Sequence, residues 1–293
     1  MPNRRRRRKR AKAIWQAIKL RENFWIALMV GNSRLHWAWF KGKTFCDAWD
    51  TQYLPASVVE QLNQPWGGGE WRQILPSSLI RQLEAVQKEV GDGFGYRDRA
   101  LPIYLASVVP EQTALWQCYP DIRVITLEQL PLQGLYPTLG IDRALAVLGA
   151  AEVWGFPVLV IDAGTALTFT SADVNHRLVG GAILPGLRLQ LQSLTQRTAA
   201  LPPIELPQEM PPRFAVNTPE AIQSGVIYTV LAGIRDFIQA WWQKFPGSRV
   251  ILTGGDRATL FAYLQIQFPE IASQIISDPN LIFMGMRSVV LSS

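Results

Sequence analysis

The sequence carries the same folding unit twice, and this repetition limits the chain to a fold with two related halves. Residues 25–45, WIALMVGNSRLHWAWFKGKTF, read as an apolar strand, a short turn around one glycine, a second strand, a polar break and a further strand. Residues 158–184, VLVIDAGTALTFTSADVNHRLVGGAIL, follow the same plan 133 positions later. With Gly31 aligned on Gly164, Met29 falls opposite Asp162.

The parallel continues downstream of each hairpin. Segments 101–117 and 248–264 both read as a strand, a turn and the beginning of a helix, and an amphipathic stretch precedes each of them, at 78–90 and 219–243. Strands and helices in a similar order twice predict two α/β domains of related topology. We expect them to span residues 23–155 and 156–293, with a ligand cleft between them and a C-terminal helix that packs back on the first domain.

Charge and cysteine usage restrict the class of protein. The sequence has 29 basic and 23 acidic residues, but eight of the basic ones lie in the segment 4–12, so the remaining 21 leave the body with a net charge of −2. We interpret residues 1–22 as a basic extension, and only this tail favours nucleic acid. No apolar run reaches the roughly 18 residues of a membrane span. Cys46 and Cys118 lack metal-site spacing, which indicates a reducing, cytoplasmic compartment.

Isolated histidines carry little signal here. His36 and His176 stand alone in the sequence, without a second ligand at metal-binding spacing. We interpret each as a packed or surface histidine rather than a metal ligand.

The turn DAGTALT at 162–168 is the first candidate for chemistry. Gly164 lets a phosphate approach backbone N–H groups, Thr165 offers a hydroxyl, and Asp162 can hold a cation. A plain β-turn in which these side chains satisfy their own backbone is an equal alternative. The repetition of the turn at Gly31-Asn32-Ser33 favours a phosphate clamp.

Two predicted helix starts supply further candidates. A helix between Gly140 and Gly155 places Asp142 in its first turn, where the helix dipole stabilises an anionic proton acceptor; a simple capping role is the alternative. Arg143 beside it suits a carboxylate or phosphate. At 217–225, we expect Thr218 to be the N-cap of the next helix, with Pro219 in the first helical position. A strand that ends at Gly254-Gly255 lets a flat ring lie against the main chain.

Taken together, these motifs resemble type III pantothenate kinase, of the actin-like and sugar-kinase-like superfamily. The match runs in order over about residues 24–290 and rests on the following residues: Gly31-Asn32-Ser33, Gly140-Ile141-Asp142-Arg143, Asp162 to Thr168, Gly180-Gly181 with Pro185-Gly186, Asn217-Thr218 with Ala221-Ile222 and Ser224-Gly225, and Thr253 to Asp256. The resemblance implies two ribonuclease H-like domains with a nucleotide-binding cleft between them. It also implies a homodimer that uses ATP with Mg²⁺ to phosphorylate pantothenate, the first step of coenzyme A biosynthesis.

The resemblance also implies roles for individual residues. Asp142 would be the catalytic base, and Asp162 would bind a monovalent cation, K⁺ or NH₄⁺. The residues implied in ATP binding are Gly31, Asn32, Ser33, Arg34, Thr165, Gly254 and Gly255. Those implied in pantothenate binding are Tyr136, Gly140, Ile141, Arg143 and Thr218.

Two positions depart from the family pattern. The family carries an aspartate two residues before the first glycine, where this chain has Met29; a methionine cannot orient Mg²⁺ or water at the transferring phosphoryl group. Either another acid replaces it, with Asp162 as the candidate, or turnover is slow. The family's pantothenate-contacting tyrosine also usually lies farther from the Gly-x-Asp-Arg run than Tyr136 does.

Three other functions remain open on the sequence alone. A non-catalytic ATP-binding accessory or regulatory protein of the same fold would bind nucleotide without turnover, and some relatives are named as transcription accessory factors. A nucleic-acid binder would act through residues 4–12 and lose binding as salt rises. A kinase for a sugar or a short acid would keep the machinery and change the acceptor.

Overall fold

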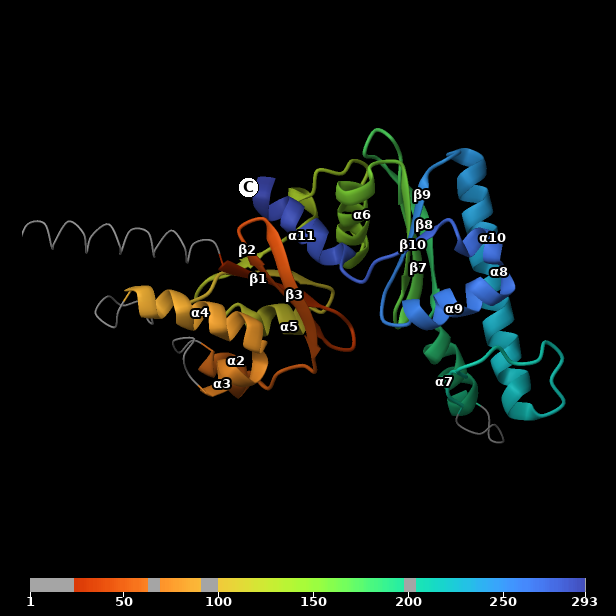
Figure 1. Ribbon diagram of the computed structural model, residues 1–293, viewed down its shortest axis with the longest axis horizontal. Coiled ribbons are helices and arrows are strands. Elements are labelled where there is room, and N and C mark those ends of the chain that lie inside the picture. Colours follow the sequence, from red (N-terminus) through yellow and green to blue (C-terminus); the bar gives the residue numbers. More distant parts are fainter. Residues whose placement is uncertain (1–23, 63–68, 91–99, 198–203, 293) are drawn as a thin grey trace, which may run out of the picture. The chain divides into compact units, whose positions relative to one another are not determined.

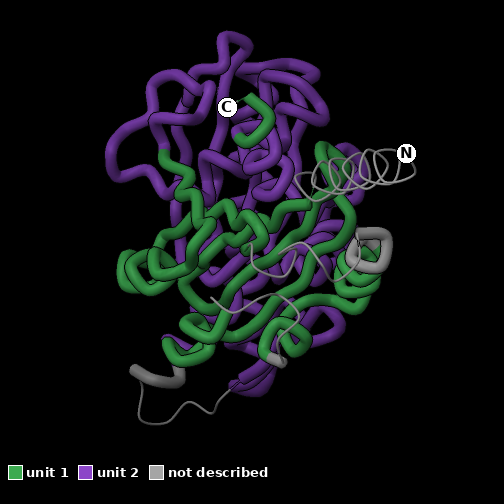
Figure 2. Tube along the Cα trace, turned by 90° about the vertical axis from the view of Figure 1, so that its left-hand side faces the viewer, with its two compact units in different colours: residues 1–126, 290–293 green, residues 127–289 purple. Residues whose placement is uncertain are grey.

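The chain forms two compact units, coloured separately in Figure 2. The structure is a computed structural model that describes residues 24–62, 69–90, 100–197 and 204–292. The basic segment 1–22, and with it the predicted nucleic-acid contact, lies outside the described residues. The first unit comprises residues 1–126 with 290–293, and the second comprises residues 127–289.

The first unit is built on a five-stranded mixed sheet in the order β3-β2-β1-β4-β5. Strands β1, β2 and β3 form an antiparallel meander, whereas β4 runs parallel to β1 and β5 runs parallel to β4. The strands are β1 (Phe24–Val30), β2 (Leu35–Lys41), β3 (Thr44–Thr51), β4 (Ile103–Ser107) and β5 (Ile122–Val124).

The second unit repeats this sheet. Its order is β10-β9-β6-β7-β8, with an antiparallel meander of β6, β7 and β8 and with β9 and β10 added parallel to β6. The strands are β6 (Val158–Ala163), β7 (Ala166–Ala172), β8 (Leu178–Pro185), β9 (Arg249–Thr253) and β10 (Ile275–Ser277). Each unit therefore has the strand order expected of a ribonuclease H-like domain, which confirms the predicted α/β fold with two related halves.

Helices cover one face of the first sheet, and alternate residues of each strand point toward them. Phe24, Ile26, Leu28 and Val30 of β1 enter one core with the buried Trp71 and other helical side chains, because successive strand residues point to opposite faces. The helices are α2 (Ala56–Gln61), α3 (Gly69–Ile74), α4 (Ser77–Val90) and α5 (Pro110–Trp116), and a 3₁₀ turn (Leu127–Gln129) follows β5.

The second sheet has helices on both faces (Figure 1). Leu159 and Ile161 pack into the core with α8 (Thr218–Lys244), and α6 (Ile141–Trp154) contacts β6 and β7 from the other side. The remaining helices are α7 (Leu187–Arg197), α9 (Arg257–Gln267), α10 (Pro269–Ala272) and α11 (Leu281–Ser292). Because α6 packs on β6 and β7, it groups with the second unit, and the division falls after Thr126, whereas the sequence placed it after residue 155.

Helix α11 packs closely on α6 through two glycines. A methyl group on Gly149 would lie 1.9 Å from the carbonyl oxygen of Leu281, and one on Gly285 would lie 2.1 Å from the carbonyl oxygen of Leu145. Farther along the same pair of helices, Arg287 donates to Glu152 at 2.8 Å. The contact fixes α6, which carries the predicted catalytic base.

One predicted detail of the helices is wrong. The side chain of Asn217, not Thr218, caps α8 by accepting a hydrogen bond from the N–H of Glu220 at 3.0 Å. Thr218 and Pro219 are therefore the first two helical residues. Both Asn and Thr are good caps, and the choice depends on which of them keeps an extended backbone; Asn217 does so, with φ −137° and ψ 155°. Among the described helices, none has the length and apolarity of a membrane span.

Candidate functional site

The amino end of α6 holds Asp142 in a fixed place. Gly140 is the N-cap residue, and a Cβ there would lie 2.4 Å from Asp142 Oδ1, so a larger residue would push this carboxylate oxygen aside. The same oxygen accepts the backbone N–H of Arg143 at 2.8 Å. The carboxylate thus folds back over the first turn of the helix, beside the glycine that precedes it.

Burial determines the acid–base character of this carboxylate. Desolvation raises the pKa of Asp142 above the usual aspartate value, and the backbone N–H and the charge of Arg143 oppose the rise. A carboxylate that loses solvation is a stronger proton acceptor than an exposed one. The carboxylate of Asp142 is therefore better suited to act as a general base than as a simple helix cap.

The guanidinium of Arg143 is buried against β7. Its Nε donates to Thr170 Oγ1 at 2.9 Å, and its Nη2 donates to the carbonyl oxygen of Phe169 at 3.1 Å. Its Nη1 donates to the hydroxyl of Tyr136 at 3.2 Å. Three of the five N–H groups of Arg143 therefore have protein acceptors, and the structure brings Tyr136, Gly140, Asp142 and Arg143 into one cluster. Ile141, between them, is 7% exposed and anchors α6 in the core.

The second turn brings Asp162 beside Gly254, at the carboxyl ends of neighbouring parallel strands. Asp162 on β6 pairs in register with Thr253 on β9, and a Cβ on Gly254 would lie 2.4 Å from Asp162 Oδ1. Gly254 also has φ +95°, which side-chain-bearing residues rarely adopt. Thr165 and Gly255 lie on the exposed parts of these two turns.

Main-chain oxygens gather around this turn. A Cβ on Gly254 would lie 2.5 Å from the carbonyl oxygen of Ala163, and a Cβ on Gly186 would lie 2.1 Å from that of Gly164 and 2.8 Å from that of Thr165. Hard cations take carboxylate and carbonyl oxygens as ligands, and Asp162 and these main-chain oxygens are donors of that kind; the oxygens of Ala163 and Thr165 also accept the N–H groups of Asp256 and Gly186. In the described part of the chain, no group of three or more His, Cys, Asp and Glu residues could hold a metal by side chains alone.

The first turn is held by a backbone hydrogen bond and by a tyrosine that follows β3. The N–H of Gly31 donates to the carbonyl oxygen of Arg34 at 3.1 Å, and the Tyr53 hydroxyl donates to the carbonyl oxygen of Gly31. Asn32, Ser33 and Arg34 are exposed. The turn of residues 31–34 is therefore tight, exposed to solvent and held by hydrogen bonds at Gly31. A phosphate-binding loop needs these properties.

Asp50 of β3 binds two residues near this turn. Its Oδ1 lies 2.7 Å from His36 Nδ1, and its Oδ2 accepts from Arg34 Nη1 at 3.3 Å. Asp50 was not among the residues predicted for the site, and His36 was expected to be isolated. Counting antiparallel positions back from the turn at Gly42 pairs His36 with Trp49, and a register shift between Trp39 and Phe40 moves its partner to Asp50.

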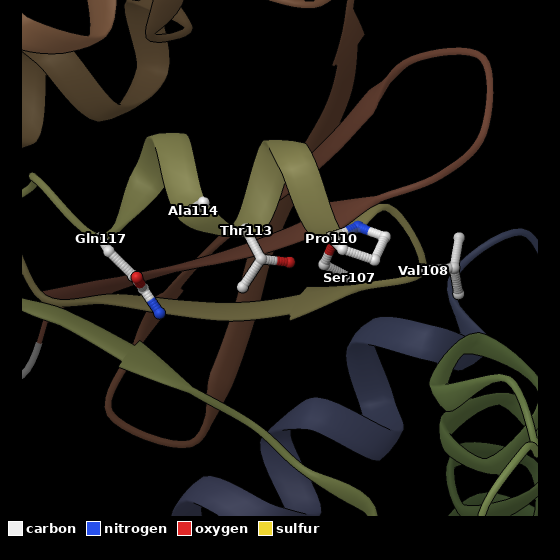
Figure 3. A pocket seen from close by; sticks show the side chains of 6 residues that line it. All are labelled: Ser107, Val108, Pro110, Thr113, Ala114 and Gln117. Atoms are coloured by element: carbon white, nitrogen blue, oxygen red, sulfur yellow. The ribbon is translucent and has the colours of Figure 1, made fainter.

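A pocket of about 380 Å³ lies in the first unit, where β4 ends and α5 follows (Figure 3). Its lining residues are Ser107, Val108, Pro110, Thr113, Ala114 and Gln117. The N–H of Val108 donates to the carbonyl oxygen of Val30, so the pocket begins next to the end of β1 and thus near the first turn. None of the predicted site residues lines it. The internal repeat could have found it, since segment 107–110 follows β4 as segment 253–256 follows β9.

Comparison with known proteins places the chain in a family. The model of the family "Type III pantothenate kinase" matches residues 25–240. A type III pantothenate kinase of Nostoc sp. is 54% identical over 280 residues, which cover 94% of this chain and 97% of that protein. One of Synechocystis sp. is 43% identical over 267 residues, covering 90% of each chain.

A solved structure shares the fold at low identity. It is a protein of Campylobacter jejuni described as a Baf family transcriptional activator, with a TM-score of 0.55 and 18% identity over 91% of this chain and 98% of that one. At this identity the likeness concerns the fold alone. The match of the family model over most of the chain, together with relatives of high identity over nearly their full length, shows that the chain belongs to the type III pantothenate kinase family.

Proposed function

We propose that this chain transfers the γ-phosphoryl group of ATP to the hydroxyl of pantothenate, giving 4′-phosphopantothenate. Membership of the family supports the reaction, and the observation that carries it is the partly buried carboxylate of Asp142 at the start of α6. Phosphoryl transfer depends mainly on positioning and electrostatics. One base, a cation site and glycine-lined turns are sufficient machinery for it.

Asp142 accepts the proton of the substrate hydroxyl in this proposal. The N–H of Arg143 holds Oδ1, and the absence of a side chain at Gly140 leaves room for the carboxylate. The burial that raises its pKa also increases its affinity for a proton as the hydroxyl attacks. The base is thus oriented before the substrate arrives.

Pantothenate binds beside this base in the proposal. Arg143 keeps two N–H groups beyond its three protein acceptors, and these are available for the substrate carboxylate. Tyr136, held by Arg143 and 41% exposed, lines the same place. Gly140 and Ile141 contribute backbone, and Thr218 contributes its hydroxyl from the start of α8.

ATP phosphates bind the glycine turns in the proposal. The turn formed by Gly31, Asn32, Ser33 and Arg34 and the turn containing Thr165 offer backbone N–H groups, while Gly254 and Gly255 let the nucleotide approach the main chain. Asp162 with its neighbouring carbonyl oxygens holds K⁺ or NH₄⁺. When bound, the monovalent ion and the Mg²⁺ of ATP neutralise phosphate charge. A homodimer in the cytoplasm completes the proposal.

The test is release of ADP from ATP and Mg²⁺, with and without pantothenate, in potassium and then in sodium buffer. Asp142→Asn is measured beside the wild type, with Asp236→Asn as the control, because Asp236 is an exposed acid on α8. We expect pantothenate-dependent turnover that requires potassium, disappears in Asp142→Asn and persists in Asp236→Asn. ATP binding without turnover for any acceptor would instead favour an accessory protein. Phosphorylation of a sugar or a short acid, but not of pantothenate, would show that the chain uses a different acceptor.

A further inference from the structure

Three side chains gather at the first glycine turn, and none of them has a side-chain role in the reaction described so far. They are Arg34 in the turn, His36 on β2 and Asp50 on β3, and each of these side chains is between 39% and 50% exposed. A Cβ on Gly31 would lie 3.3 Å from His36 Nε2, so that nitrogen lies against the turn. His36 thus has one ring nitrogen on Asp50 and the other on the turn.

The pairing with Asp50 decides which ring nitrogen carries a proton. The hydrogen bond from His36 is the largest influence that lowers the pKa of Asp50, Arg34 adds to it, and burial opposes both. The ionised carboxylate can only accept, so the Nδ1 of His36 donates at 2.7 Å. When the ring is protonated, Nε2 is also a donor, and it lies against the turn.

The charged groups around His36 leave a net positive site when the ring is protonated. Asp50 on β3 contributes one negative charge and Arg34 one positive charge, while Met29, opposite His36 in the register of β1 and β2, is neutral and 1% exposed. An ion pair that only joined β2 to β3 would not require a ring nitrogen on the turn. A cationic donor beside a glycine suits an oxyanion.

We propose that His36, oriented by Asp50, donates a hydrogen bond from Nε2 to a phosphate oxygen of ATP held at the turn of residues 31–34. The inference rests on the proposed binding of ATP phosphates at this turn. Asp50 acts as a positioning residue through His36. The pair supplies polar recognition from β2 and β3, where the facing position on β1 is the apolar Met29.

The test compares the affinity for ATP with the affinity for adenosine, which lacks phosphates. We measure Kd by titration calorimetry on the full-length chain for wild type, His36→Gln, Asp50→Asn and the control Asp121→Asn. The control removes Asp121, the acid of a similar exposed ion pair with Arg123. This pair lies at the opposite edge of the same sheet. At pH 6.5 we expect His36→Gln to bind ATP about tenfold more weakly and adenosine as the wild type does.

A second readout separates a phosphate contact from a structural ion pair. We expect Asp50→Asn to bind ATP more weakly than the wild type and to bind adenosine as the wild type does, with the Tm of His36→Gln and Asp50→Asn close to that of the wild type. Unchanged ATP affinity in His36→Gln would overturn the inference. So would equal losses for ATP and adenosine together with a lower Tm, since that pattern indicates a structural role.

The same measurements keep this inference apart from the proposed kinase activity. If wild type binds ATP but phosphorylates no pantothenate, the proposed function fails, and the comparison of ATP with adenosine still decides the role of His36. If wild type turns over and His36→Gln binds ATP as tightly as wild type, the role of His36 fails alone. Failure of the wild type to bind ATP at all would overturn both.

Discussion

Gly140 and Asp142 are fitted to one another: a methyl group on Gly140 would lie 2.4 Å from Asp142 Oδ1. Gly140 has φ −59° and ψ 129°, a backbone conformation open to any residue. The missing side chain of Gly140 therefore leaves room for the carboxylate of Asp142 and is not needed for the backbone conformation. The position of the predicted base depends on this glycine.

Replacing Gly140 with alanine should move the carboxylate and slow the reaction. We expect Gly140→Ala to lower kcat about 100-fold, because a misplacement of about 1 Å costs that much, while its far-UV circular dichroism stays that of the wild type. Steady-state kinetics with pantothenate measures the change. Gly233→Ala, in open space on α8, is the matched control and should keep wild-type kcat. Equal kcat values for the two variants would remove Asp142 from its proposed role.

The acid limb of the pH–rate profile should report Asp142. Burial raises its pKa, and only the ionised form can accept a proton, so kcat/KM should fall on acidification at a pH above the usual range of an aspartate. Initial rates between pH 4 and pH 8, with ADP release as the signal, measure the limb. A profile that stays flat down to pH 4 would show that no group with a raised pKa controls the rate.

Neutralising the same residue should stabilise the fold. A raised pKa means that the folded state binds more protons than the unfolded state, so Asp142 lowers the free energy of unfolding as pH rises through the unfolded and then the folded pKa. Asp142→Asn should therefore have a higher Tm than wild type at pH 7, and the difference should vanish at a pH below the unfolded value. Calorimetry at the two pH values tests this; a lower Tm at pH 7 would contradict it.

The contact between α6 and α11 should be intolerant of a single methyl group. Gly149→Ala places a Cβ 1.9 Å from the Leu281 carbonyl oxygen, and we expect it to lower the free energy of unfolding by about 1–3 kcal/mol. Gly233→Ala, with nothing within 4 Å, should raise the free energy of unfolding by about 0.5–1 kcal/mol, since alanine has the higher helix propensity. Urea unfolding of both variants provides the comparison. Similar shifts in both would mean that α11 does not pack on α6 in solution.

Arg143 should not tolerate lysine. Lysine cannot reach Thr170, Phe169 and Tyr136 together, because it has one nitrogen in place of a planar fork. We expect Arg143→Lys to lower the free energy of unfolding by about 1–3 kcal/mol and to raise the KM for pantothenate more than the KM for ATP. Arg249→Lys, at the exposed first residue of β9, is the control and should change neither. An unchanged KM for pantothenate would confine Arg143 to a structural role.

The secondary-structure elements and their duplication could be predicted from the sequence, because both depend on local signals. Strands such as Phe24–Val30 and Val158–Ala163 are short apolar runs that end at glycine turns, and α6 is bounded by Gly140 and Gly155. The repeat predicted two α/β halves, which the identical strand orders confirm. The family could be identified from motif order alone. The cap of α8 was wrong because Asn217 and Thr218 are adjacent and both suited to capping.

Which residues from distant parts of the chain contact one another depends on the tertiary structure. His36 and Asp50 are brought together by the register of β2 and β3, Gly149 meets Gly285 through the packing of two helices, and α6 joins the second unit because it packs on β6 and β7. The raised pKa of Asp142 likewise comes from its burial, which no neighbour in the sequence reveals. Periodicity and turn residues act within a few positions along the chain, whereas register, packing and desolvation depend on all the elements at once.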